Sequence, residues 1–398
     1  MPPPPGGRRR AASVRRKGVI PMIYKTFQDL ELSALGMGCM RLPVVNGDDA
    51  QVDEAATFQM VDEAMASGVN YYDTAWGYHS GNSELVLGKA LARYPREKFY
   101  LADKFPGYDL SNMPKVKEIF EEQLKKCQVD HFDFYLFHNV CEMNIDAYLD
   151  PKYGIYDYLM EQKKNGRIRH LGFSCHGAMP VLKRFLEAYG KDMEFCQLQL
   201  NYIDWTFQNG REKVDLLGEY HIPVWVMEPL RGGRLARLSE AEAAPLKAMR
   251  PDETVPAWAF RFLQSIPSVT MVLSGMSDLE QMKANLATFQ TEDPLSEGEM
   301  AGLLEMAGGM VSKTALPCTA CHYCVSHCPK GLNIPELLSL YNEHSFTGGG
   351  FLAPMALSAV PQDKWPSACI GCRSCEKVCP QQLKISEAMA DFTAKLGG

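Results

Sequence analysis

The sequence contains no run of about 18 apolar residues, the length that a membrane-spanning helix needs. It has no excess of positive charge either, because its formal net charge is −7. Proteins that bind nucleic acids usually present a basic surface, so an acidic chain argues against nucleic acid as a partner. With 46% hydrophobic and 22% charged residues among 398, the composition is typical of a folded globular protein. We therefore predict a folded protein with neither a membrane nor a nucleic acid as its partner.

The first 21 residues differ in composition from the rest of the chain. They include the prolines Pro2 to Pro5 and two arginine-rich clusters, and they contain no acidic residue. Such a segment cannot bury apolar surface, so we predict a disordered basic tail over residues 1–21. No apolar segment follows the arginines, which argues against an export signal. The cysteines scattered through the rest of the chain suit a reducing compartment, and we expect a cytoplasmic protein.

Eight of the 13 cysteines fall into two runs of identical spacing near the C-terminus. The runs are Cys318-x-x-Cys321-x-x-Cys324-x-x-x-Cys328-Pro329 and Cys369-x-x-Cys372-x-x-Cys375-x-x-x-Cys379-Pro380. In runs of this kind, three cysteines bind one iron–sulfur cluster and the cysteine before proline binds the neighbouring cluster. We therefore predict two [4Fe–4S] clusters. The predicted ligand sets are Cys318, Cys321, Cys324 and Cys379 for one cluster, and Cys369, Cys372, Cys375 and Cys328 for the other.

Two other cysteine-based interpretations fit less well. A disulfide framework is typical of small secreted chains, and a structural zinc site usually consists of two Cys-x-x-Cys pairs. The flanks of the two runs also repeat, since Cys328-Pro-Lys-Gly-Leu parallels Cys379-Pro-Gln-Gln-Leu. This duplication resembles a bacterial two-cluster ferredoxin module.

Short apolar runs alternate with amphipathic segments over the preceding 260 or so residues, a typical length for a (β/α)8 barrel. The runs are near-continuous, as expected for parallel strands that are covered on both faces. The eight candidate strands are residues 35–40, 70–74, 99–104, 132–138, 170–174, 195–200, 224–227 and 269–274. We therefore predict an α/β protein with a (β/α)8 TIM barrel over residues 22–293. A doubly wound open sheet is the alternative, but Gly36-Met37-Gly38 lacks the third glycine of its usual nucleotide-binding motif.

Two further segments complete the predicted organisation. Residues 294–312 are expected to form a linker helix, because Ser296 and Glu299 have the spacing of a capping box. Residues 313–398 are expected to form a small, mainly α-helical, ferredoxin-like domain with two clusters.

Polar residues occur at or just after the ends of three successive candidate strands, namely Asp73, Tyr78, Lys104 and His138. Active sites of (β/α)8 barrels lie at these strand ends. A phenol has a pKa near 10, and we expect a nearby ammonium group to lower it. A carboxylate would keep the lysine charged, and an imidazole would orient the substrate oxygen. The set therefore predicts a proton donor for a carbonyl that is being reduced by hydride.

These residues resemble the aldo/keto reductase family. The resemblance includes Leu35-Gly-Met-Gly38, Asp73-Thr-Ala-Trp-Gly-Tyr78, Lys104, His138 and Leu171-Gly-Phe-Ser174. With the cysteine runs, the chain is similar to bacterial members that carry a C-terminal two-cluster domain. The resemblance implies that Asp73, Tyr78, Lys104 and His138 are catalytic, with Tyr78 as the general acid. It also implies NADP(H) or NAD(H) as the cofactor, bound by residues that include Ser174, Gln197, Gly275, Gln281 and Asn285.

The chain departs from the family pattern at several of these positions. Cys175 occupies a position that usually holds Asn, and Met227 occupies one that often holds an aromatic ring against the nicotinamide. Gly275 and Gln281 correspond to positions where NADP-dependent members grip the 2′-phosphate with Lys or Arg. Two uncharged residues at these positions weaken the expected preference for NADP(H), unless Arg231, Arg234 or Lys283 binds the 2′-phosphate instead.

Three functional hypotheses remain open from the sequence. In the first, the barrel is an oxidoreductase for a carbonyl or alcohol, and the clusters are coupled to it or support it. In the second, the clusters pass electrons to a redox partner protein. In the third, the clusters only hold the C-terminal region in place. We expect the substrate to be chosen by loops near residues 107–113, 139–153 and 205–209, together with the cluster domain.

Overall fold

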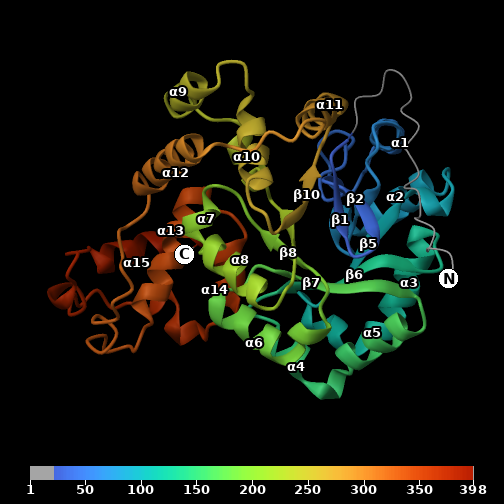
Figure 1. The fold of residues 1–398 in the computed structure, drawn as a ribbon. Helices are drawn as coiled ribbons and strands as arrows, with labels where there is room; N and C mark the ends of the chain where they lie inside the picture. Colours follow the sequence, from blue (N-terminus) through green and yellow to red (C-terminus); the bar gives the residue numbers. More distant parts are fainter. Residues whose placement is uncertain (1–21, 398) are drawn as a thin grey trace, which may run out of the picture.

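The computed structural model describes residues 22–397 and contains a closed barrel of eight parallel strands (Figure 1). Neighbouring strands follow the chain order, and the last strand closes the barrel onto the first. The predicted TIM barrel is therefore confirmed, and every candidate strand is present. The barrel strands are β3 (Leu35–Gly38), β4 (Tyr71–Asp73), β5 (Tyr100–Phe105), β6 (Phe132–Val140), β7 (Ile168–Cys175), β8 (Cys196–Gln199), β9 (Val224–Met227) and β10 (Val269–Gly275).

A short hairpin precedes the barrel and was not predicted. Its strands β1 (Tyr24–Phe27) and β2 (Leu30–Ser33) pair antiparallel. Phe27 and Leu32 are buried with the side chains that fill the barrel interior, including Trp225. The hairpin therefore closes the end of the barrel opposite the strand ends that carry the polar residues.

Helices surround the barrel and cover the outer face of its strands (Figure 1). In α3, for example, Ile119, Phe120 and Leu124 are buried on one side of the helix. The barrel helices are α1 (Glu54–Ala66), α2 (Ser83–Leu91), α3 (Val116–Cys127), α4 (Ile145–Leu149), α5 (Ile155–Lys164), α6 (Met179–Tyr189), α7 (Asp204–Phe207), α8 (Gly210–Glu219), α9 (Glu240–Met249), α10 (Val255–Gln264) and α11 (Leu279–Thr288).

The segment expected as a linker contains helix α12 (Glu297–Ser312), which packs onto the barrel region. Its N-terminus has the capping box, with the Ser296 hydroxyl accepting from the Glu299 N–H and the Glu299 carboxylate accepting in return. Leu303 and Met310 are buried in the core shared with the barrel helices. The helix therefore extends the barrel domain more than it separates two domains.

The C-terminal region is mainly α-helical, as predicted, and has a core of its own. Its helices are α13 (Ile334–Thr347), α14 (Leu352–Ser358) and α15 (Ile385–Lys395). Leu337, Met389 and Phe392 contribute to that core, together with the two most buried cluster cysteines, Cys324 and Cys375. Between residues 22 and 397 there is no helix with the length and apolarity needed to cross a membrane. The predicted basic tail, residues 1–21, lies outside the described residues.

Candidate active site and cluster sites

The barrel brings the four predicted catalytic residues together at one end of its strands. Asp73 ends β4, and Lys104 lies near the end of β5. Tyr78 begins a 3-10 turn that follows β4, and His138 lies near the end of β6. Because parallel strands end at the same rim, residues far apart in sequence meet there.

Lys104 and Asp73 form a buried ion pair at the centre of this group. The Lys104 Nζ lies 2.6 Å from Asp73 Oδ1 and 2.6 Å from the Thr74 carbonyl oxygen. Burial lowers the pKa of Lys104, but the Asp73 carboxylate and the Tyr78 oxygen outweigh it, so the net pKa is raised. The Lys104 ammonium is therefore held charged and in a fixed position.

Tyr78 lies against that ammonium. The Lys104 Nζ is 5.0 Å from the centre of the Tyr78 ring. Burial raises the pKa of Tyr78, and Lys104 opposes the rise without reversing it. The ammonium thus lowers this pKa as expected, but the net pKa is raised because desolvation of the phenolate is the larger effect. At neutral pH, Tyr78 keeps its proton and can donate it.

His138 lies on the other side of Tyr78. The two rings meet edge to face with centroids 6.0 Å apart. Burial, then Lys104 and His176, hold the pKa of His138 well below its usual range, so the imidazole is neutral at pH 7. Its buried Nδ1 has no hydrogen-bond partner among the described residues. Because Nδ1 is buried, a ligand at the rim would meet the other ring nitrogen, Nε2.

A polar network behind Lys104 was not predicted. Gln123 of α3 donates to Asp103 Oδ1 at 2.8 Å, to Glu84 Oε1 at 3.0 Å and to the Lys104 carbonyl at 3.0 Å. Burial and the Glu84 carboxylate raise the pKa of Asp103 well above its usual range. The network fixes the strand that carries Lys104, and it joins that strand to Glu84 of α2 and Gln123 of α3, which are 39 residues apart in sequence.

Ser174 and Gln197, two of the residues expected to bind the cofactor, have hydrogen-bonding groups that suit the carboxamide of a nicotinamide. The Ser174 hydroxyl accepts from the Asn139 N–H at 2.7 Å, which leaves its own hydrogen to donate. Gln197 donates through Nε2 to Asp73 at 3.2 Å, which leaves its oxygen to accept. One donor and one acceptor match the carbonyl and amino groups of a carboxamide. Cys175 does not share this position, because it is buried in the outer core.

The residues expected at the far end of the nucleotide carry no positive charge. Asn285 donates to the Ser274 hydroxyl at 3.1 Å, beside Gly275 at the end of β10. Gln281 donates to the carboxylate of Asp278, which caps the N-terminus of α11. Neither position carries a Lys or Arg, although the exposed Arg41 side chain packs against Gly275. A phosphate beside Gln281 would meet the Asp278 carboxylate.

Arg231 and Arg234, considered as substitutes for that grip, are engaged elsewhere. Arg231 lies in a buried ion pair with Asp204 at 3.0 Å, and Arg234 pairs with Glu242 at 3.1 Å. Lys283 is exposed on α11. Arg231 therefore serves the packing of the molecule, since its side chain is only 3% exposed.

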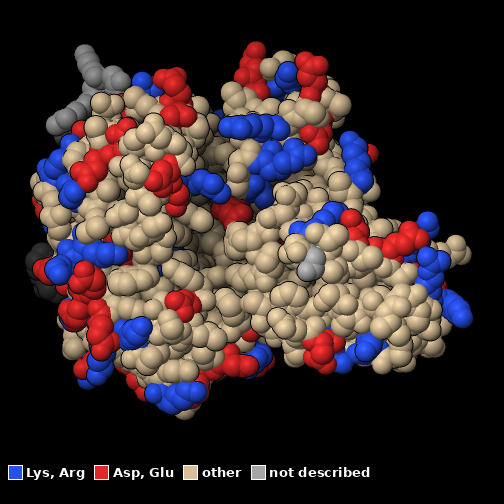
Figure 2. Space-filling model, turned by 180° about the vertical axis from the view of Figure 1, so that it is seen from behind, with Lys and Arg blue, Asp and Glu red and all other residues tan. Residues whose placement is uncertain are grey.

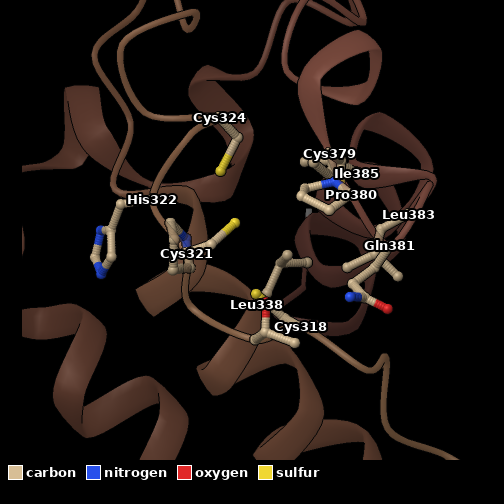
Figure 3. Close-up of a pocket in the computed structure, with 12 residues that line it drawn as sticks. Cys318, Cys321, His322, Cys324, Leu338, Cys379, Pro380, Gln381, Leu383 and Ile385 are labelled. Carbon is tan, nitrogen blue, oxygen red and sulfur yellow. The ribbon is translucent and has the colours of Figure 1, made fainter.

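The eight cysteines of the two runs surround two cavities in the C-terminal region. Cys318, Cys321, Cys324 and Cys379 line the first, of about 320 Å³ (Figure 3). Cys328, Cys369, Cys372 and Cys375 line the second, of about 360 Å³. The grouping is the interleaved one expected from the sequence, with one cysteine exchanged between runs.

The donor set of each cavity fits a cubane cluster better than a single ion. Nowhere in the part of the chain that the structure describes do three Cys, His, Asp or Glu side chains converge on one ion position. A cubane binds each cysteine through a different iron, so its four sulfurs stand farther apart than the ligands of one ion. Each cavity has four thiols around an otherwise largely apolar space, an arrangement that suits one cysteine for each iron of a cubane.

The backbone of the two runs supports the same interpretation. Ala320 and His322 have φ of 51° and 63°, and the matching residues Gly371 and Arg373 have 66° and 59°. Left-handed residues occur in the backbone nests that turn successive N–H groups toward one point at many iron–sulfur sites. Three of these four residues are not glycine, so the conformation is strained and points to a bound group.

Comparison with known proteins assigns both parts of the chain. The aldo/keto reductase family model matches residues 34–307, which is more than half of the sequence. The chain belongs to the aldo/keto reductase family. A model of the 4Fe-4S dicluster domain matches residues 317–384. The protein is thus an NAD(P)-dependent oxidoreductase of this family with a C-terminal iron–sulfur domain.

Individual aldo/keto reductases match the barrel but not the whole chain. The NADH-specific methylglyoxal reductase of Escherichia coli is 25% identical over 325 residues, 70% of this chain and 96% of that protein. A probable aldo-keto reductase from Glycine max is 28% identical over 226 residues, 55% of this chain and 62% of the relative. The structure of aldo-keto reductase AKR11C1 from Bacillus halodurans, in its holo form, matches with a TM-score of 0.59 and 27% identity. The match covers 72% of this chain and 96% of that chain.

Two further residues at the reductase site were missed by sequence reasoning. Tyr108 meets His138 edge to face with centroids 5.2 Å apart, and burial raises the pKa of Tyr108 to about 12. His176 follows β7 and bonds through Nδ1 to Gln199 Oε1 at 3.0 Å. Tyr108 falls in a loop that was expected to contact substrate. His176 had a signal too, since it comes two residues after the predicted strand 170–174.

Proposed function

We propose that the barrel reduces a carbonyl by hydride transfer, with Tyr78 as the proton donor. The observation that carries this proposal is the buried Lys104–Asp73 ion pair placed 5.0 Å from the Tyr78 ring. The nicotinamide supplies the hydride when it is bound. Tyr78 holds a proton at its hydroxyl oxygen at neutral pH and releases it to the substrate oxygen as negative charge develops there.

The other three residues support that proton transfer. The Lys104 ammonium stabilises the phenolate that remains when the proton leaves. Asp73 keeps Lys104 protonated and in place. Neutral His138 orients the substrate oxygen toward Tyr78 through Nε2, the ring nitrogen that is not buried. Ser174 and Gln197 would hold the nicotinamide carboxamide, with the Ser174 hydroxyl as donor and the Gln197 side-chain oxygen as acceptor.

We propose NADH as the preferred donor. Gly275 and Gln281 offer no charge to a 2′-phosphate, and the Asp278 carboxylate would repel one. The name of the Escherichia coli relative, an NADH-specific methylglyoxal reductase, agrees with this choice and suggests small dicarbonyls as first substrates to try.

We propose two [4Fe–4S] clusters on the eight cysteines, with the folding of the C-terminal region as their first role. Leu338 of α13 lines the first cluster cavity, whereas Phe346 of the same helix packs against Phe207 of the barrel. Eight residues of helix separate them, which is about 12 Å along the axis. The first cluster cavity therefore lies about two helical turns from this contact with the barrel. A hydride carries two electrons and a [4Fe–4S] cluster accepts one, so in this proposal the hydride passes directly between nicotinamide and substrate.

A role in electron transfer to a partner protein is the second candidate. It is favoured by Cys321 and Cys372, which are exposed, and by the neighbouring Tyr323 and Ile370, which are 61% and 60% exposed. Reduction of the clusters by a one-electron donor, followed by spectroscopy, tests this role. Clusters that stay oxidised at all accessible potentials would exclude it.

The experiment for the main proposal uses anaerobically purified full-length protein with its iron content measured. Oxidation of NADH and NADPH is followed with methylglyoxal and with simple aldehydes and ketones. Tyr78→Phe is expected to abolish turnover, whereas Tyr220→Phe, at an exposed position far from the rim, is expected to retain it. Equal iron in the two variants and undiminished turnover in Tyr78→Phe would refute the proposal.

A further inference from the structure

Helix α14 of the iron–sulfur region lies at the rim of the barrel, beside the reductase site. Three contacts place it there. Asn139 Nδ2 donates to Met355 Sδ at 3.3 Å, and Ser358 Oγ donates to Met143 Sδ at 3.3 Å. Phe351, just before the helix, meets the His176 ring edge to face at 5.5 Å.

The barrel residues that α14 touches are close neighbours of the proposed catalytic group. Asn139 directly follows His138, and its N–H binds the hydroxyl of Ser174. His176 lies near enough to His138 to contribute to the lowering of its pKa. The helix thus lies over the side of the rim that carries His138 and the carboxamide site.

This side of the rim keeps unsatisfied polar atoms next to an apolar wall. The buried atoms Asn139 Oδ1 and His138 Nδ1 have no hydrogen-bond partner within residues 22–397. Phe351 is 51% exposed, which is unusual for a phenylalanine, and Met355 is only partly buried. Small-molecule sites are lined mainly by apolar side chains with a few polar residues that fix the ligand, and the side chains of Phe351 and Met355 lie beside His138, Asn139 and His176 in this way. Figure 2 shows that the molecule is hollowed between the barrel and the C-terminal region.

A buried ion network holds the C-terminal region in this position. Arg231 of the barrel pairs with Asp204 at 3.0 Å and with Glu343 of α13 at 2.7 Å. Gln208 also donates to Glu343, and Phe207 packs on Phe346. Since α13 packs directly on α14, the network fixes α14 over the rim.

We propose that Phe351 and Met355 form the apolar wall of the substrate pocket and set its preference for carbonyls with an aromatic or other apolar substituent. The proposal rests on the proposed function of the barrel. The carbonyl end of such a substrate reaches Tyr78 and His138, and its apolar end lies on Phe351 and Met355. The two residues determine specificity and take no part in the proton or hydride step.

The test compares a small aldehyde, acetaldehyde, with a bulky apolar one, 2-naphthaldehyde, on the cluster-containing full chain. Removal of apolar contacts from a pocket lowers kcat/KM by about tenfold or more for the substrate that used them. Phe351→Ala and Met355→Ala are expected to lose about tenfold for 2-naphthaldehyde and less than about twofold for acetaldehyde. Gln362→Ala, exposed just beyond α14, is the matched control and should change neither value.

The same experiment distinguishes a change in substrate specificity from loss of folding and from failure of the proposed function. Iron content shows that each variant keeps its C-terminal region, which is expected because neither side chain is fully buried. If the native chain reduces neither aldehyde, the proposed function fails, and calorimetry of 2-naphthaldehyde binding decides the inference. A dissociation constant that rises about tenfold in Met355→Ala supports it. An unchanged ratio of kcat/KM values, an unchanged dissociation constant, or no binding at all overturns it.

Discussion

Replacement of Lys104 by methionine removes the charge that stabilises the Tyr78 phenolate. The side chain is fully buried, so methionine preserves most of the apolar stem and deletes the ammonium. The Nζ lies 5.0 Å from the Tyr78 ring centre. At an effective dielectric constant of about 20, this separation corresponds to about 3 kcal/mol of attraction between the ammonium and a phenolate.

That energy is present only when Tyr78 carries negative charge, so it acts on the transition state and much less on substrate binding. Its loss is expected to lower kcat roughly 200-fold and to leave KM within about threefold. The assay is steady-state NADH oxidation at pH 7 with a carbonyl substrate. Direct titration of Tyr78 by its phenolate absorbance should show a pKa higher still than in the native protein, since burial is then unopposed by Lys104.

The matched control is Asp73→Asn, which keeps the shape of the ion pair but removes the carboxylate. Without it, burial lowers the pKa of Lys104, so the ammonium is lost as pH rises. The variant should approach Lys104→Met at high pH and recover activity at lower pH. A Lys104→Met protein with its iron intact and kcat within about threefold of the native value would refute the electrostatic role of Lys104.

Three further predictions address other parts of the molecule. Because the pKa of Tyr78 is raised and that of His138 is lowered well below 6.5, kcat/KM should be flat from about pH 6.5 to about pH 10, and an inflection near pH 6.5 would contradict the neutral imidazole. Cys379→Ser should remove the cluster bound by Cys318, Cys321 and Cys324, and a measured iron loss confined to the other cluster would disprove the interleaved ligand sets. Gln281→Arg should raise kcat/KM for NADPH about tenfold with little change for NADH, and no gain would place the 2′-phosphate elsewhere.

The barrel could be predicted from the sequence because its signals are local. Each strand is a short apolar run, such as residues 132–137, bounded by polar turns. The N-terminal hairpin gave no such signal. Phe27 and Leu32 lie in a short segment among polar residues, and they are buried by residues far along the chain, such as Phe134 and Trp225.

The candidate site was predictable where strand ends carry unusual residues. The positions of Asp73, Lys104 and His138 at predicted strand ends identified them as candidate site residues. The spacing of the cysteines identified them as candidate cluster ligands. The Gln123 network and the contacts of Phe351 and Met355 were not accessible, because they join elements through the folded packing. The direction of the Tyr78 pKa also needed the structure, since it depends on how deeply the ring is buried against a charge 5.0 Å away.

The central claim is that hydride passes directly to the substrate at the barrel rim and not through the iron–sulfur clusters. The most direct measurement uses NADH deuterated at the transferred position, the cluster-containing full chain and a carbonyl substrate in ordinary water. Mass spectrometry of the alcohol should find one deuterium on the carbon that was the carbonyl. Electrons carried by the clusters would arrive singly and the carbon would take its hydrogen from solvent, so an unlabelled alcohol would contradict the account.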